Sequence, residues 1–225
     1  MKKELLRGLL ATSMIGGIAL GLAAPASADS LDTDTTVGFK SDSHIEPPVD
    51  PADGTLALLW APKKFDFGQN HVAGSSGPAI AQKSDVELAG KKAYVVVRDD
   101  RAVDPANEWK LTVQGSNLAT TGPKYLTGAS YTLNAKNALK YVGSSSPELA
   151  GSTGGADASV TTTTQTFAAG GSAVEIAKMA APSAKDAWAI EVSDIELTVP
   201  VGDVALAADG EKYNGKLTWT LSDTI

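Results

Sequence analysis

The chain has 225 residues, of which 43% are hydrophobic, 20% charged and 6% aromatic, a composition typical of a globular protein. The absence of cysteine excludes a disulfide scaffold, a thiol nucleophile and a zinc finger, and two histidines are too few for a multi-histidine metal site. The formal net charge of −7 argues against a nucleic-acid binder, because contact with phosphates requires clustered Lys and Arg.

Residues 1–28 have the layout of a secretory signal peptide. A positively charged start is followed by an apolar run at residues 9–24 and by the small-residue cleavage site Ala26-Ser27-Ala28. The apolar run is shorter than the roughly 20 residues that a membrane-spanning helix needs. We therefore expect a secreted mature chain that starts at Asp29 and retains no membrane span. Secretion without cysteine is typical of a Gram-positive host.

Residues 29–53 are predicted to form a flexible acidic leader. They are rich in Asp, Ser, Thr and Pro, and they contain too few apolar residues to offset the entropy cost of ordering. Asp32-Thr33-Asp34 resembles the start of a calcium-binding loop, but the Gly and Glu expected later in such a loop are missing. We therefore expect no metal site here, and we assign residues 54–225 to one domain.

The domain shows strand patterns rather than helix patterns. Apolar and polar residues alternate from Tyr213 to Leu221, which is typical of a half-buried strand. Further strands are predicted at residues 56–60, 94–97, 109–113, 131–133, 160–167, 188–192 and 195–199. The best helix candidate, residues 173–179, is short and precedes Pro182. Roughly eight to ten short strands predict an all-β fold.

The predicted architecture is a single antiparallel β-sandwich with long polar loops, and an immunoglobulin-like arrangement is one alternative. Two loops are unusually long, at residues 68–83 and 143–158, and both are rich in Gly and Ser. Loops of this length in a compact domain are either functional or disordered, and the sequence leaves both alternatives open.

Several acidic residues are candidates for the catalytic pair of a glycosidase. Such an enzyme needs two carboxyl groups about 5–9 Å apart. The candidates are Asp99 with Asp100, or a second group formed by Glu191, Asp194 and Glu196. Adjacent residues on a strand point to opposite faces, so the first pair is poorly placed. We expect no catalytic residue and no cofactor. Arg101 directly follows Asp99 and Asp100. We expect these residues to form an ion pair that fixes the turn before the next strand.

The most distinctive motif is a repeated Trp-x-Leu. Trp109-Lys110-Leu111 starts one predicted strand, and Trp219-Thr220-Leu221 ends the last one. Residues i and i+2 share one face of a strand, so each motif sets an indole beside a leucine. One interpretation is core packing, because burial of about 200 Å² of indole is worth several kcal/mol. The other is a groove in which Trp109, Leu111, Trp219 and Leu221 bind a ligand, with the indoles stacked on sugar rings or anchoring a peptide.

Several further segments surround the two tripeptides in a recognisable order. They are residues 56–62, Phe65-Asp66-Phe67-Gly68, residues 94–101, Leu126-Thr127-Gly128-Ala129, residues 195–200 and the terminal Tyr-x-Gly-x-Leu-Thr-Trp-x-Leu at 213–221. In order, spacing and terminal position they resemble the WxL-domain surface proteins of Gram-positive bacteria. The resemblance extends from about residue 54 to the C-terminus.

This resemblance implies a β-sandwich that attaches non-covalently to peptidoglycan in the cell wall, with Trp109, Leu111, Trp219 and Leu221 as the wall-binding residues. It also implies two protein partners, a membrane-anchored WxL-interacting protein and a small sortase-anchored protein. We therefore expect a non-enzymatic protein of the cell surface. The alternative is a protein-recognition module that binds the WxL-interacting protein within a multi-component surface complex.

Overall fold

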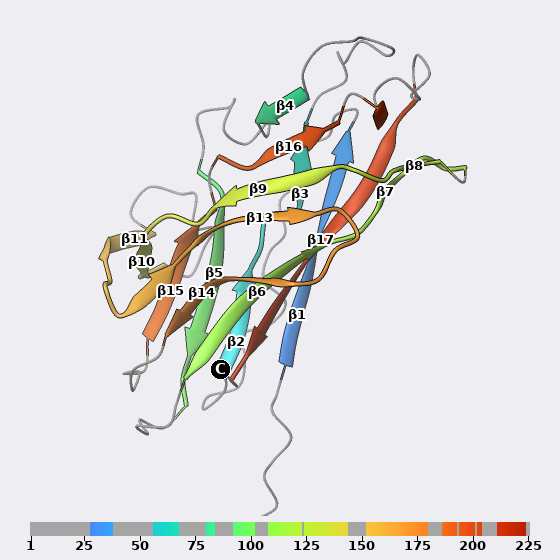
Figure 1. Cartoon of the computed structure of the whole chain (residues 1–225). Coiled ribbons are helices and arrows are strands. Elements are labelled where there is room, and N and C mark those ends of the chain that lie inside the picture. Colours follow the sequence, from blue (N-terminus) through green and yellow to red (C-terminus); the bar gives the residue numbers. More distant parts are fainter. Residues whose placement is uncertain are drawn as a thin grey trace, which may run out of the picture.

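The computed structural model describes residues 28–37, 56–67, 80–83, 92–101, 108–122, 124–143, 152–179, 186–192, 194–200, 202–203 and 211–223. The regular structure in these ranges is almost entirely β-strand (Figure 1). No helix among the described residues is both long and apolar enough to cross a membrane. The predicted signal peptide lies outside these ranges, apart from Ala28.

The strands of the described residues form three sheets. The largest has eight strands: β12 (Val160–Thr162), β14 (Val174–Met179), β6 (Trp109–Gly115), β17 (Tyr213–Ser222), β1 (Ala28–Val37) and β3 (Lys64–Asp66) in this order, with β7 (Leu118–Ala119) and β8 (Tyr125–Leu126) attached beside β17. All neighbours in this sheet pair antiparallel except β1 and β3, which run parallel.

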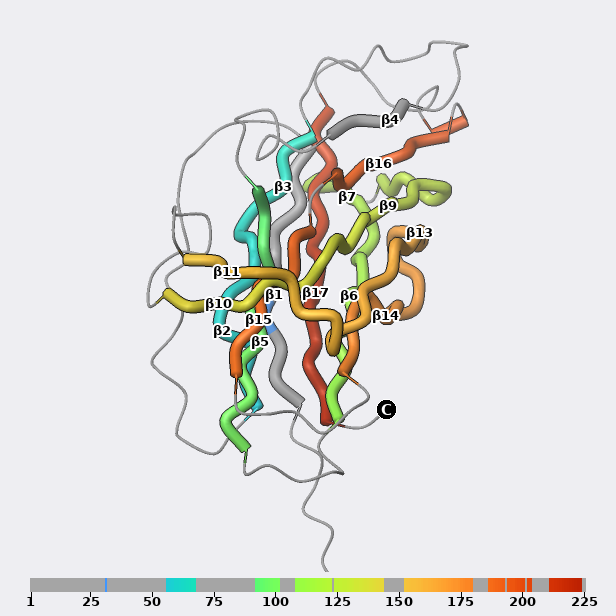
Figure 2. Tube along the Cα trace, turned by 90° about the vertical axis from the view of Figure 1, so that its left-hand side faces the viewer, coloured from blue at the N-terminus to red at the C-terminus, as the bar shows by residue number. Residues whose placement is uncertain are grey.

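Two smaller antiparallel sheets complete the fold. The five-stranded sheet has the order β11 (Thr153–Ala156), β10 (Ala138–Tyr141), β15 (Asp186–Glu191), β5 (Tyr94–Asp99) and β2 (Leu56–Trp60). The four-stranded sheet has the order β13 (Thr164–Ala168), β9 (Ser130–Asn134), β16 (Glu196–Val199) and β4 (Ile80–Lys83). Figure 2 shows β2, β5 and β15 on one side of the molecule and β17, β6 and β14 on the other.

One apolar core receives side chains from all three sheets. Aromatic rings pack both between and within the sheets: the ring centroid of Trp109 of β6 lies 5.6 Å from that of Trp188 of β15 in the five-stranded sheet, and that of Tyr131 of β9 lies 5.5 Å from that of Phe167 of β13 within the four-stranded sheet. Gly115 at the end of β6 leaves room for this packing, because a Cβ there would lie 2.9 Å from the ring of Tyr131. The prediction of an all-β sandwich is confirmed.

The flexible-leader prediction is wrong for residues 29–37. These residues belong to the ten-residue strand β1, which pairs with β17 along its whole length. The prediction failed because it counted apolar side chains, whereas the pairing of a strand depends on main-chain groups that every residue except proline provides in full. The remaining leader residues, 38–53, lie outside the described ranges.

The structure differs from the predicted elements at several further places. The best helix candidate, residues 173–179, forms strand β14, and the predicted strand at residues 160–167 is divided into β12 and β13. Strands β4 and β11 lie within the two predicted loops. The described residues contain seventeen strands, more than predicted. Many of them are too short to show an alternating pattern, and their neighbours in the sheet stabilise them.

Candidate functional site

The fold brings the two Trp-x-Leu motifs together. They lie on β6 and β17, which are adjacent antiparallel strands in the largest sheet. The register sets Leu221 opposite Leu111 and Trp219 opposite Val113. Trp109 stands at the start of β6, opposite Met179 of β14. The motifs are far apart in sequence and form one continuous apolar surface on the inner face of this sheet.

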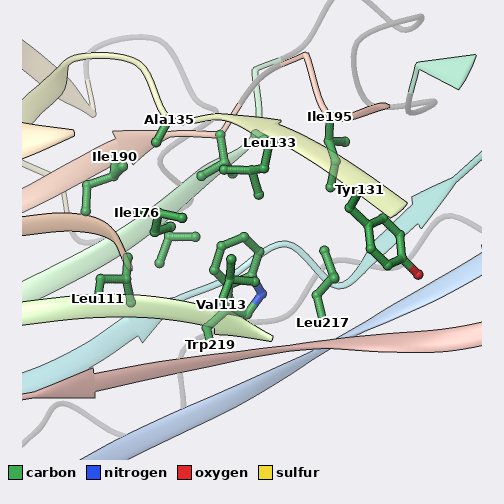
Figure 3. Close-up of a cluster of buried hydrophobic side chains, with 14 of the residues drawn as sticks. Leu111, Val113, Tyr131, Leu133, Ala135, Ile176, Ile190, Ile195, Leu217 and Trp219 are labelled. Carbon is green, nitrogen blue, oxygen red and sulfur yellow. The ribbon is translucent and has the colours of Figure 1, made fainter. Parts of the chain in front are cut away.

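This surface is the centre of the core. The exposed fractions of Trp109, Leu111 and Trp219 are 0%, and that of Leu221 is 1%. Figure 3 shows Leu111 and Trp219 on the side of the sheet that faces Leu133 of β9. The groove interpretation is therefore corrected for these four residues, because a side chain without exposed surface cannot stack on a sugar ring. Core packing is the interpretation that the structure supports.

The indole of Trp109 packs against a second tryptophan. Its ring is tilted by 45° to the ring of Trp188, whose Nε1 donates a hydrogen bond of 2.9 Å to Oδ2 of Asp157. In the described part of the chain, Nε1 of Trp109 is buried without an acceptor. Tilted aromatic pairs of this kind add about 0.5–1.5 kcal/mol beyond the burial of their area. The contact therefore connects the largest sheet to the five-stranded sheet.

A charged cluster lies over the ring of Trp188, the second member of this buried tryptophan pair. Nζ of Lys140 lies 2.8 Å from Oδ2 of Asp157, forms a second ion pair with Asp186, and lies 5.5 Å from the centroid of the Trp188 ring. Hydrogen bonds from Lys140, Ser159 and Trp188 hold the pKa of Asp157 well below its ordinary value. Burial lowers the pKa of Lys140, but its two carboxylate partners outweigh this and raise it overall.

We expect this cluster to make stability depend on acid pH. Because the pKa of Asp157 is depressed in the folded state, its contribution is fully present above the unfolded value of about 3.9 and is lost as the pH falls towards the folded pKa. The unfolding free energies of the wild type and Asp157→Asn should therefore differ most near neutral pH, and the difference should shrink progressively as the pH falls below about 4. A difference that stays constant down to pH 2 would contradict this role.

The predicted ion pair before the first Trp-x-Leu motif is confirmed, and it is buried. Arg101 donates to both carboxylate oxygens of Asp99 at 2.9 Å, and the exposed fraction of Asp99 is 0%. Nη2 of Arg101 also donates to the main-chain oxygen of Glu108 at 3.2 Å, directly before Trp109. The pair thus connects the end of β5 to the start of β6.

Four of the five carboxylates considered for glycosidase chemistry form ion pairs, and Asp100 pairs with Arg98. Asp99 is held by Arg101, Glu191 binds Lys92 at 2.9 Å, and Asp194 binds Lys136. Among the described residues, no group of three acidic or histidine side chains is placed to hold a metal ion.

A polar surface that the sequence analysis missed lies on the outer face of the four-stranded sheet. We call it the Thr/Asn array, and it consists of Thr132 and Asn134 of β9 with Thr164 and Thr166 of β13. Oγ1 of Thr132 lies 3.0 Å from Oγ1 of Thr166, and Thr164 donates to Oδ1 of Asn134 at 2.7 Å. All four side chains are exposed or half-exposed. In the sequence, Thr132 and Asn134 alternate with the apolar residues Tyr131 and Leu133. This alternation predicts a strand, but it does not by itself indicate a binding surface.

These observations define an all-β sandwich domain in which paired tryptophan-bearing strands form the core. A family model described as "WxL domain surface cell wall-binding" matches residues 26–224, and the chain belongs to this family. The match includes β1, so the domain begins before the boundary predicted at residue 54. Searches of curated proteins and of solved structures found no match. The family relationship indicates association with the cell wall at the cell surface.

Proposed function

We propose that this chain is a non-enzymatic protein that binds peptidoglycan directly and non-covalently after export by the signal peptide at residues 1–28. The observation that carries the proposal is the match of nearly the whole chain to a cell wall-binding family. Because the Trp-x-Leu side chains are buried, the contact with the wall must use a solvent-facing surface. The motif then acts indirectly, by holding the sheets that present this surface.

The Thr/Asn array is the surface that we propose for the glycan. Hydroxyl and amide groups both donate and accept hydrogen bonds, which matches the hydroxyl and acetamido groups of a polysaccharide. The four residues carry no charge, whereas the chain as a whole has a net charge of −7. Glu196 of β16, which is opposite Thr132 in the register, is an acidic neighbour of the array, whereas the four array residues themselves add no Coulomb repulsion from an anionic wall. Their hydrogen bonds to each other also hold the side chains in one arrangement.

The double variant Thr132→Val/Thr166→Val tests this surface. Valine keeps the shape of threonine, and removing both partners of a hydrogen bond changes folding stability little. Loss of two hydroxyl contacts of about 0.5–1.5 kcal/mol each should weaken binding by about 5-fold to 150-fold. The measurement is co-sedimentation with protein-free peptidoglycan sacculi, after circular dichroism has confirmed folding.

The matched control is Thr218→Val, on the outer face of the largest sheet, which should bind like the wild type. Equal binding by the double variant would contradict the Thr/Asn array as the contact. Because the protein and the wall are both acidic, binding of the wild type should persist when salt is added. A wild-type chain that fails to sediment would contradict direct wall binding and favour the alternative, recognition of a membrane-anchored WxL-interacting protein.

A further inference from the structure

The outer face of the largest sheet carries two lysines at directly opposite positions. Lys178 of β14 is opposite Lys110 of β6 in the register, and these strands lie side by side next to β17 (Figure 1). The neighbours of each lysine along its own strand are buried in the core, so both side chains point to the outer face. Like charges at paired strand positions are unfavourable, so this pair requires compensation by negative charge.

The compensation within the chain is incomplete. Oε1 of Glu175 lies 3.2 Å from Nζ of Lys178 and forms an ion pair with it. Lys110, in contrast, forms no ion pair within the part of the chain that the structure describes. The two positive charges therefore share one carboxylate.

A like-charged pair in the five-stranded sheet is, in comparison, fully compensated. Asp186 of β15 is opposite Asp99 of β5. Lys140 pairs with Asp186, and Arg101 pairs with Asp99, so each of these carboxylates has its own cation. The lysine pair of the largest sheet lacks the corresponding second partner, and an anion from outside the chain would supply it.

Hydroxyl groups stand at both ends of the lysine pair. Thr161 of β12 is opposite Lys178, and Ser222 of β17 is opposite Lys110. We call these four residues the lysine row. Neighbouring strands are about 4.8 Å apart, so ammonium groups on adjacent strands can both reach one oxygen-rich anion. Ammonium and hydroxyl groups are hydrogen-bond donors, and a phosphate group presents several strong acceptor oxygens to them.

We infer that the lysine row binds phosphate groups of an anionic polymer in the cell wall. Charge complementarity favours this occupant, because the row joins two cations on a chain whose net charge is −7. The family relationship indicates that the chain meets the wall. A phosphate between the two ammonium groups also offsets the repulsion between them. The inference rests on association with the wall and not on the Thr/Asn array, which lies on a different sheet.

Calorimetric titration of the exported protein with soluble poly(glycerol phosphate) at low salt tests the inference. The double variant Lys110→Gln/Lys178→Gln should weaken binding at least about tenfold, because two charge-assisted hydrogen bonds to phosphate are lost. Lys110→Arg/Lys178→Arg keeps both charges and should still bind. Added salt should weaken binding of the wild type to this polymer, in contrast to binding through the uncharged Thr/Asn array.

The charge-matched control is Lys124→Gln/Lys136→Gln, which removes two positive charges that lie outside the row. It should bind the polymer like the wild type. An equal loss in the control and in the row variant would show that net charge alone matters, and would overturn the inference. A wild-type chain that does not bind the polymer would also overturn it.

Two further measurements keep these outcomes interpretable. Circular dichroism should show that the row variant is folded, because the Glu175–Lys178 pair is partly exposed and contributes little to stability. The Thr132→Val/Thr166→Val chain should bind the polymer like the wild type. Because no sacculi are present, failure of phosphate binding is distinct from failure of the peptidoglycan contact.

Discussion

Replacing Trp219 with alanine is expected to lower the free energy of unfolding by about 3–5 kcal/mol, the usual cost of removing a buried tryptophan. The indole has an exposed fraction of 0% and lies among core residues of two sheets, with Leu111 on the adjacent strand and Leu133 across the core. Its removal leaves a cavity that β-strands fixed by their pairing cannot readily close. Urea unfolding followed by fluorescence or circular dichroism measures the change.

Thr218→Ala is the matched control for this prediction. It lies next to Trp219 on β17 but on the opposite face of the sheet, and it should change the unfolding free energy by less than about 1 kcal/mol. The informative contrary result is a Trp219→Ala chain that unfolds at the wild-type urea concentration but no longer binds sacculi. That result would show that the indole of Trp219 contributes to wall binding and not to stability.

Replacing Asp99 with alanine is expected to lower the free energy of unfolding by about 3 kcal/mol. Loss of one partner from a buried ion pair leaves the other charge without compensation, at a cost of about 3–5 kcal/mol. We expect the lower end of this range because the side chain of Arg101 is 18% exposed. The variant also loosens the connection between β5 and the first Trp-x-Leu strand. Urea unfolding again measures the change.

Two further variants make this prediction specific. Lys124→Ala breaks the ion pair with Glu211, in which the lysine side chain is 53% exposed, and should change the unfolding free energy by no more than about 1 kcal/mol. The double variant Asp99→Leu/Arg101→Met removes both charges and should recover part of the loss. A double variant that is as unstable as Asp99→Ala would show that the unpaired charge of Arg101 is not the cause.

The two stability predictions and the wall-binding prediction concern different residues, so they can be separated experimentally. Trp219 and Asp99 stabilise the sandwich from within, whereas the Thr/Asn array lies on its surface. A sacculus-binding defect in a core variant counts as a wall contact only if that variant is folded under the assay conditions. We expect the Thr132→Val/Thr166→Val chain to keep its fold, because both changes preserve side-chain volume and face solvent.

The sequence by itself determined the fold class, most of the long strands and the ion pair between Asp99 and Arg101. These features depend on local patterns: period-two alternation shows which residues share a face, and two acidic residues followed by an arginine can pair within one turn. The order of the motifs along the sequence also indicated the WxL-domain family. These predictions needed no knowledge of which strands are neighbours.

Only the tertiary structure decided that the Trp-x-Leu side chains are core residues and that residues 28–37 form a strand. Alternation marks one face of a strand as apolar, but it does not show whether that face meets another sheet or lines a groove. For β6 and β17 the inner faces of the other two sheets cover it. Strand β1 has little apolar pattern of its own, and its order comes from the main-chain partners on β17 and β3, which only the folded chain provides.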